Sequence, residues 1–198
     1  MDRHQIKCIG RANGLLPHQR IDVIGGVNSN GTRWKINIAT AINGINTNKW
    51  SFYLISGGLV VDIVIGNYGD FDTSYANGYK ASLWLYENIG TLTIPAYQLI
   101  DSDYVNISSL NLDVAGNQPT LRLTPTFGDL DGDNDLDMII GDYQGYLHYF
   151  ENSAGVGNTA NFSLSSVQYQ GIDVGNFAAP QLIDLDRDNL IDLVIGRR

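Results

Sequence analysis

Two segments of the sequence place aspartates at alternate positions. The first segment contains Asp129, Asp131, Asp133, Asp135 and Asp137, and the second contains Asp184, Asp186, Asp188 and Asp192. Carboxylates this crowded repel one another unless a cation lies among them. A ligand set made only of oxygens favours calcium, magnesium or manganese over zinc or copper. Calcium suits a tight loop best, because it accepts oxygens from alternate residues, so two calcium sites are predicted. The alternative is a solvated acidic turn that holds no ion.

The calcium loop of an EF-hand assigns a role to each position by analogy. Side chains at loop positions 1, 3 and 5 are expected to bind the ion. A backbone carbonyl at position 7, from Asp135 or Leu190, would add a ligand, and the carboxylate of Asp137 or Asp192 would close the shell. Each loop therefore supplies a complete set of oxygen donors.

The residues around these positions exclude a true EF-hand. That motif needs a bidentate Glu at position 12, where this chain has Ile140 and Ile195. Position 6 must turn sharply, and Asn134 and Asn189 tolerate the left-handed conformation that the turn needs. Short β-branched runs follow both loops, so each loop is predicted to lead into a strand.

The composition is typical of strands joined by many turns, with 43% apolar residues, 17% charged residues and 22 glycines. The formal net charge of −9 is local, because nine of the 21 acidic residues lie in the two loops and the other 12 balance 12 Lys and Arg. Without a basic stripe, nucleic acid is not expected as a partner. No apolar run approaches the roughly 18 residues of a membrane helix, and the N-terminal residues do not resemble a secretory signal.

The strand after each loop belongs to a repeat. Residues 62–66 match residues 137–141 and 192–196, and a second strand recurs at 83–88 and 147–152. Antiparallel units repeated in this way predict an all-β fold, with the blades of a propeller as the first choice and a sandwich as the second.

The link between the first pair of strands, residues 67–80, is eleven residues longer than the corresponding link in the next unit. Long loops on a repeated scaffold often carry binding surfaces. Its three tyrosines and one phenylalanine could form an aromatic contact patch, or they could pin a solvent-facing loop.

Residues 124–152 resemble one nearly complete repeat of the FG-GAP/VCBS family, whose best known relatives are the calcium-binding propeller blades of integrin alpha subunits. Residues 179–196 resemble the first half of another repeat. The resemblance implies a β-propeller, usually of seven blades, with calcium held in a hairpin turn between neighbouring strands. It makes the same aspartates the metal ligands, with Arg187 in the place of the usual glycine at position 4.

The repeats divide the chain into units. Residues 1–51 match poorly and are interpreted as N-terminal strands of a degenerate blade, and residues 52–120 as a blade whose metal loop is lost. Counting back from Asp62, positions 1, 3 and 5 of that loop are Leu54, Ser56 and Gly58. Residues 121–178 are predicted to form a blade with a calcium loop, and residues 179–198 the first half of a further such blade. Three to four blades predict a fragment of a larger propeller, unless an N-terminal strand completes the last blade.

The function expected from these features is a non-catalytic calcium-binding module that meets a protein or glycan ligand outside the cell or at its surface, as in adhesion. The alternative is an accessory domain of a secreted carbohydrate-active or other hydrolytic enzyme. The only glutamates, Glu87 and Glu151, occupy equivalent positions in two repeats, which argues for a structural role. His148 aligns with Trp84 and has no nucleophile beside it in the sequence, so catalysis by this chain is not expected.

Overall fold

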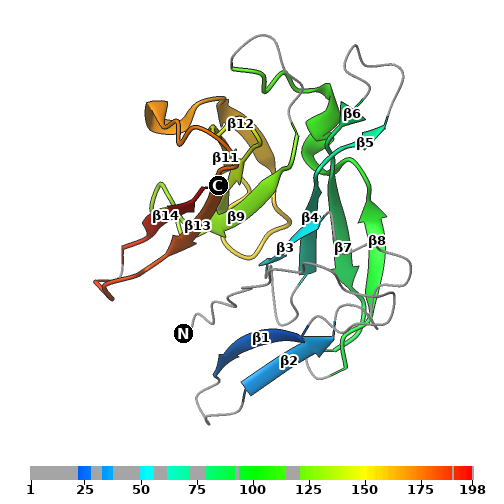
Figure 1. The fold of residues 1–198 in the computed structure, drawn as a ribbon. Coiled ribbons are helices and arrows are strands. Elements are labelled where there is room, and N and C mark those ends of the chain that lie inside the picture. Colours follow the sequence, from blue (N-terminus) through cyan, green and yellow to red (C-terminus); the bar gives the residue numbers. More distant parts are fainter. Residues whose placement is uncertain are drawn as a thin grey trace.

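The computed structural model describes residues 22–27, 33–37, 50–55, 62–71, 79–91, 94–114, 121–188 and 190–197. Every strand pair within them is antiparallel, which confirms the all-β class (Figure 1). The strands in chain order are β1 (Asp22–Val27), β2 (Arg33–Asn37), β3 (Trp50–Ile55), β4 (Asp62–Asn67), β5 (Asp70–Phe71), β6 (Tyr79–Lys80), β7 (Leu83–Asn88), β8 (Tyr97–Asp101), β9 (Thr124–Gly128), β10 (Asp137–Gly141), β11 (Leu147–Asn152), β12 (Phe162–Ser166), β13 (Ala179–Ile183) and β14 (Asp192–Gly196). Two short 3₁₀ helices are η2 (Tyr104–Ser109) and η3 (Tyr169–Gly171).

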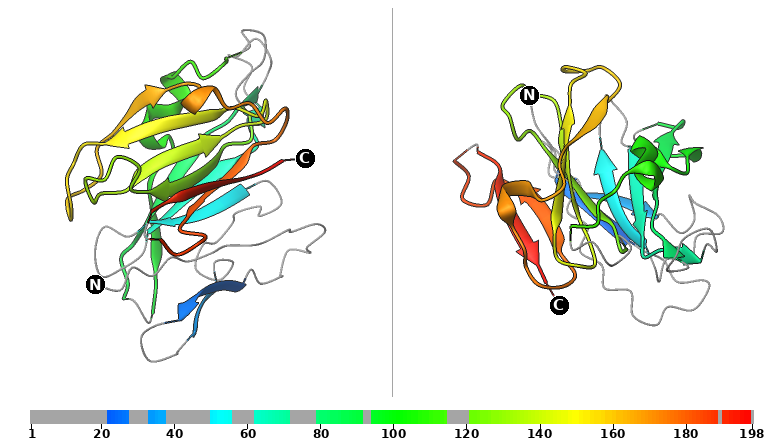
Figure 2. Two further views of the ribbon diagram at one scale, coloured as in Figure 1. Left: turned by 90° about the vertical axis from the view of Figure 1, so that its left-hand side faces the viewer. Right: turned by 90° about the horizontal axis from the view of Figure 1, so that it is seen from above.

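Three sheets carry the repeated segments. The first sheet has the order β3-β4-β7-β8, the second has the order β9-β10-β11-β12, and the third pairs β13 with β14. Seen from above, these three sheets stand side by side, with the second between the other two (Figure 2, right). The strands β1 and β2 form a separate hairpin, and β5 and β6 form a small ladder within the long link of the first sheet.

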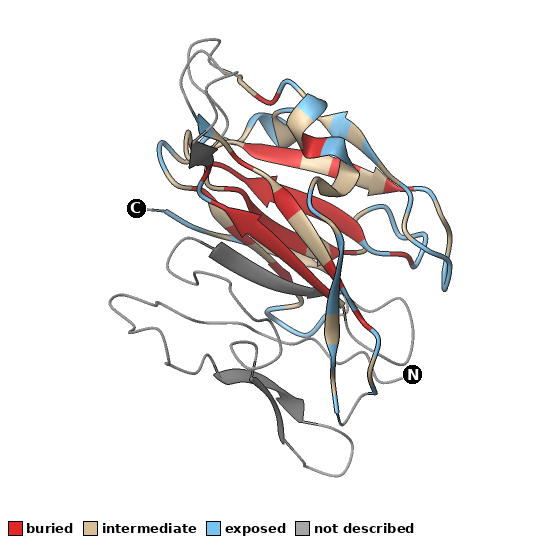
Figure 3. Cartoon of the chain, turned by 90° about the vertical axis from the view of Figure 1, so that its right-hand side faces the viewer, coloured by how far each residue is buried: buried red, intermediate tan, exposed pale blue. Residues whose placement is uncertain are grey.

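The central strands of the first two sheets are buried on both faces. Ile63, Val64 and Ile65 of β4 are 0% exposed, as are Met138, Ile139 and Ile140 of β10. Successive side chains of a strand point to opposite faces, so a fully apolar run suits a strand with a neighbouring layer on each side. The buried strands form continuous bands through the molecule in Figure 3.

Strand β10 therefore serves two hydrophobic cores. Met138 and Ile140 pack in the core that the first and second sheets share, which also contains Val64. Ile139 points the other way and packs with Leu182 of β13 in the core between the second and third sheets. Full burial of each such side chain contributes about 1.5–3 kcal/mol, so the alternation along β10 stabilises both layers.

The same junction joins each sheet to the next. The Leu123 N–H donates to the carbonyl of Asn67 at 3.0 Å, and the Ala178 N–H donates to the carbonyl of Asp142 at 2.9 Å. Asn67 ends the second strand of the first sheet, and Asp142 directly follows the second strand of the second sheet. Each donor directly precedes the first strand of the next sheet. As a result β9, the first strand of the second sheet, contacts both β3 and β13.

The connection between β3 and β4 differs in length from the two aspartate loops. Its strands β3 and β4 are separated by six residues, 56–61, whereas eight residues, 129–136 and 184–191, separate the strands around the aspartate loops. Leu54 lies within β3 opposite Ile63, and Ser56 and Gly58 lie outside the described residues. The division into units at residues 52, 121 and 179 stays a prediction.

The long link, residues 67–80, contributes to the junction between sheets through Tyr68, which directly follows β4. Tyr68 is 38% exposed, and its ring meets that of Tyr143 edge-on at 6.2 Å between centroids. Tyr143 in turn packs on Phe177 at 4.6 Å. Part of the link, residues 72–78, lies outside the described residues, so the predicted aromatic contact patch stays a prediction.

Candidate metal centre

The structure brings the first three aspartates of each loop together. Carboxylate oxygens of Asp129, Asp131 and Asp133 all lie within 4.8 Å of one another. The second loop repeats this arrangement, since carboxylate oxygens of Asp184, Asp186 and Asp188 also lie within 4.8 Å of one another. The first loop joins β9 to β10 and the second joins β13 to β14, so each triad sits in a hairpin turn between the first two strands of its sheet.

Backbone N–H groups hold the carboxylates of the first loop in place. Asp129 accepts from Gly132 at 2.8 Å and from Asn134 at 3.1 Å through its two oxygens. Asp131 accepts from the N–H of Asp133 at 3.1 Å. These local turns point the acidic side chains into the bend of the loop, where a cation would screen their mutual repulsion.

The second loop is built in the same way. The N–H of Asp188 donates to Asp184 at 3.1 Å and to Asp186 at 3.2 Å, and the N–H of Leu190 donates to Asp188 at 2.8 Å. In both loops the N–H groups at positions 5 and 7 donate to the carboxylates at positions 3 and 5. The first aspartate accepts from positions 4 and 6 in the first loop and from position 5 in the second.

Left-handed residues allow the loops to close. Asn134 has φ +71°, as expected for position 6, and its counterpart Asn189 lies outside the described residues. Position 4 is also left-handed, with φ +85° at Gly132 and φ +66° at Arg187. A side chain in this conformation costs roughly 1–2 kcal/mol, so Arg187 strains the second loop in addition to placing a positive charge there.

Asp137, the ninth residue of the first loop, lies outside the triad. It is 0% exposed, and its two oxygens accept from the N–H of Leu130 at 3.0 Å and from the N–H of Asn152 at 2.9 Å. Burial, opposed by these two donors, raises the pKa of the Asp137 carboxyl above its ordinary value of 3.8. Asp192 holds the second loop similarly, accepting from the N–H of Leu185 at 2.8 Å.

From the sequence, Asp135 is expected only as a backbone-carbonyl ligand, and the structure shows that its side chain also has a defined position. It is 6% exposed, and one oxygen accepts from the N–H of Gly155 at 2.7 Å. Its other oxygen is buried without a hydrogen-bond partner. Burial, together with the negative charges of Asp133 and Asp131 and against the Gly155 N–H, raises the pKa of the Asp135 carboxyl. The set of donors thus fits a hard cation, because a buried orphan carboxylate oxygen beside an acidic triad is stabilised by positive charge.

Two asparagines support the loops from the neighbouring strand. Asn152 ends β11 and is 5% exposed. Besides donating its N–H to Asp137, it accepts from the N–H groups of Ala154 and Asn161 at 3.2 and 2.8 Å. Asn88 ends β7 and does the same in the first sheet. The repeated Glu-Asn pair in the sequence was the signal that could have revealed this role.

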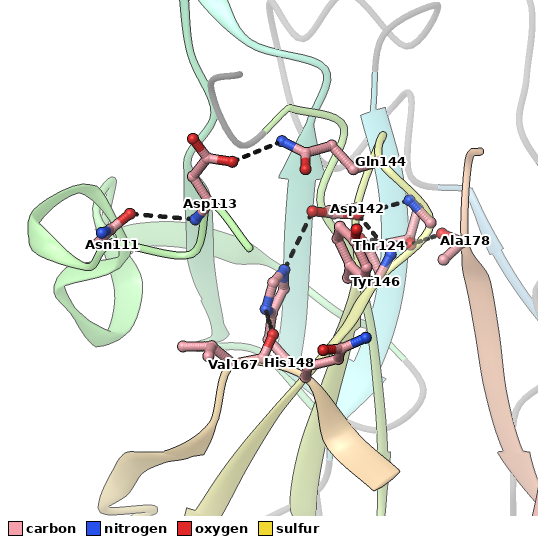
Figure 4. A network of polar contacts seen from close by, with 12 residues as sticks. Asn111, Asp113, Thr124, Asp142, Gln144, Tyr146, His148, Val167 and Ala178 are labelled. Atoms are coloured by element: carbon pink, nitrogen blue, oxygen red, sulfur yellow. Dashed lines mark hydrogen bonds and ion pairs between the residues drawn. The ribbon is translucent and has the colours of Figure 1, made fainter. Parts of the chain in front are cut away.

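A buried polar pair lies away from the loops, at the turn between β10 and β11 (Figure 4). The ring of His148 contacts the carbonyl of Val167 at 2.7 Å and the carboxylate of Asp142 at 3.3 Å. Asp142 also accepts from the N–H groups of Gly145 and Tyr146, both at 2.9 Å. Both members of the pair are 0% exposed, so this network fixes the turn and is not open to a substrate.

Comparison of the chain with models of protein families, with curated proteins and with solved structures finds no match. Within the described ranges, none of the helices has the length and apolar character needed to cross a membrane.

Proposed function

We propose that this chain is a calcium-stabilised, non-catalytic repeat module. The observation that carries the proposal is the convergence of two carboxylate triads in two hairpin turns of the same design. Three anionic oxygens within 4.8 Å of one another favour a hard divalent ion, and calcium accepts the flexible geometry that a short loop provides. The ion would then neutralise the triads and stabilise the turns.

In this proposal the three sheets are successive blades of a β-propeller related to FG-GAP/VCBS repeats. The repeated junction supports it, because the second strand of one sheet binds the segment that leads into the first strand of the next. The contacts of β9 with both β3 and β13 support it as well, since the first strands of neighbouring blades lie side by side around a propeller axis.

The proposed role is binding of a protein or glycan outside the cell or at its surface. Extracellular modules can use weak calcium sites, and loops such as these are open to solvent at Asp131 and Asp133. Burial of His148 in its pair with Asp142 supports a non-catalytic role for that histidine, because both side chains are 0% exposed and do not meet a substrate.

Thermal unfolding with calcium chloride and with a chelator tests this function. Calcium is expected to raise the melting temperature, since an ion that binds only the folded state stabilises it by about 2.7 kcal/mol per site at one hundred times its Kd. The chelator is expected to reverse the gain. Replacing Asp131→Asn and Asp186→Asn together should abolish most of the shift.

The matched control is Asp173→Asn, which changes an exposed aspartate outside both loops that accepts from the N–H of Gly175 at 2.7 Å. This variant should keep the full calcium response. A melting temperature of the unchanged chain that does not move with saturating calcium would refute the proposal.

A further inference from the structure

The two aspartate loops differ at position 7. The first loop has Asp135 there, which is 6% exposed, and the second has Leu190, which is 67% exposed. The remaining carboxylates at positions 1, 3, 5 and 9 are the same in both loops. The first loop therefore carries one more negative charge, and carries it in a buried position.

Asp135 follows the first triad directly in the loop, two positions after Asp133. Its backbone N–H donates to the carboxylate of Asp133 at 2.9 Å, and the negative charges of Asp133 and Asp131 act on its carboxyl group. Its second oxygen is buried and has no hydrogen-bond partner. A buried carboxylate oxygen without a donor carries a desolvation cost that a nearby cation offsets.

The same side chain connects the loop to a distant hairpin. Its bonded oxygen accepts from the N–H of Gly155 at 2.7 Å, twenty residues along the chain. Gly155 belongs to the connection between β11 and β12, where Val156 is 66% exposed. Asp135 thus makes a direct polar contact between the first loop and this exposed hairpin.

The second loop has the opposite features. Leu190 offers no side-chain oxygen, and Arg187 holds a left-handed conformation with φ +66° where the first loop has Gly132. A loop with fewer carboxylates, a positive charge and backbone strain is a weaker site for a divalent ion.

We propose that the side chain of Asp135 makes the first loop the stronger of two unequal calcium sites and couples its occupancy to the hairpin between β11 and β12. This inference rests on the proposed calcium function. The ion reaches the first loop at lower concentration, where it satisfies the orphan oxygen and fixes the carboxylate that holds Gly155. The hairpin is then ordered by calcium at concentrations that leave the second loop empty.

Calorimetric titration with calcium chloride measures the two sites separately in the full chain. The double variant Asp184→Asn/Asp186→Asn removes the second site and leaves the first. The double variant Asp129→Asn/Asp131→Asn removes the first site and leaves the second. The first site is expected to bind at least about tenfold more tightly, because affinity in such loops follows the number of ligand charges. Amide hydrogen exchange should show residues 153–161 gaining protection at the lower calcium concentration.

A reciprocal pair of variants tests the residue itself. Asp135→Asn keeps the acceptor for Gly155 but removes the charge, so it should weaken the first site by about tenfold and leave the second unchanged. Leu190→Asp adds a carboxylate at an exposed position and should tighten the second site by about threefold. If Asp135→Asn fails to fold, the comparison of single sites and Leu190→Asp decide the question.

The outcomes separate the two proposals. Absence of calcium binding at both loops refutes the proposed function and this inference with it. Binding with equal constants at the two loops, or a first-site constant unaffected by Asp135→Asn, refutes the inequality alone. A hairpin whose exchange ignores calcium refutes the coupling.

Discussion

Asp62, Asp137 and Asp192 occupy the same place in their sheets, at the start of the second strand. In the first two sheets the carboxylate accepts the N–H of the asparagine that ends the third strand, at 2.9 Å in both cases. This aspartate therefore has a structural task that does not depend on an ion. The task explains why the first sheet keeps Asp62 although the carboxylates of a metal loop are missing from it.

A substitution at Asp62 separates the charge of this residue from its hydrogen bond. Burial, opposed by the N–H of Asn88 and helped by the charge of Glu87, raises the pKa of Asp62 above its ordinary value of 3.8. The folded state then binds the proton more tightly than the unfolded state. Its stability falls as pH rises from the unfolded pKa through the folded pKa, and the full cost remains at neutral pH.

Asp62→Asn should consequently raise the melting temperature at pH 7 by about 1–2 °C, a small amount because solvent screens this partly exposed group. The amide oxygen can still accept from Asn88. The gain should shrink as pH falls through the folded-state pKa, where the wild-type carboxyl is protonated too. A gain that persists unchanged in acid would contradict the explanation.

At the scale of the elements, the third and fourth strands of a sheet are joined through one buried asparagine. Asn152 accepts two backbone N–H groups of the following hairpin and donates its amide to the carbonyl of Leu136 at 3.3 Å. Asn88 accepts from Gly90 at 3.0 Å and from Ala96 at 3.1 Å in the first sheet. One side chain thus ends a strand, shapes a hairpin and holds the start of the second strand.

Asn152→Ala should lower the free energy of unfolding by about 2–4 kcal/mol, because it removes three hydrogen bonds from part-buried backbone groups, those of Leu136, Ala154 and Asn161. Urea denaturation measures the loss. Asn158→Ala provides the comparison, since Asn158 lies in the same hairpin, is exposed, and its side-chain amide donates to the carbonyl of Ala154 at 2.8 Å. That variant should cost less than about 1 kcal/mol, and equal losses would show that the strand end is not the important feature.

Sequence patterns predict the strands and turns better than they predict the roles of single residues. The apolar runs at 62–66 and 137–141 predict buried strands, and alternate aspartates predict turns that gather carboxylates. Asn88 and Asn152 escaped notice because an asparagine next to a turn has many ordinary explanations. The sequence places Arg187 where a glycine is usual, and its left-handed backbone, with φ +66°, follows from the closure of the loop, which only the three-dimensional geometry reveals.

At the scale of the whole molecule, the glycine at the end of the second strand, or one residue before it, sets the distance between sheets. A Cβ on Gly66 would lie 2.1 Å from the carbonyl oxygen of Leu123, and one on Gly141 would lie 2.4 Å from that of Ala178. The repeat reveals these glycines in the sequence, but their reason lies in the neighbouring sheet. Gly196 ends the second strand of the third sheet, and its nearest neighbour would be 3.7 Å away.

Thr124 reinforces this junction on the other side. Its hydroxyl lies 2.7 Å from the carbonyl oxygen of Ala178 and 3.0 Å from that of Gly141, so it can donate to the backbone of either sheet. The segment before β13 is therefore held between the end of β10 and the start of β9. A Cβ at Gly141 would overlap the backbone of Ala178 and the ring of Pro180. Neither can move aside as a flexible side chain can.

Three equivalent glycines allow the packing of the sheets to be tested with an internal control. Gly141→Ala should destabilise the chain by at least about 1–3 kcal/mol in urea denaturation, since the added methyl group forces the second and third sheets apart. Gly66→Ala should act similarly between the first and second sheets. Gly196→Ala, at the same repeat position, should change stability little, because ordinary contact distances surround it. Equal effects at Gly141 and Gly196 would mean that the glycines serve the strand itself, and that the close approach of successive sheets does not determine how they pack.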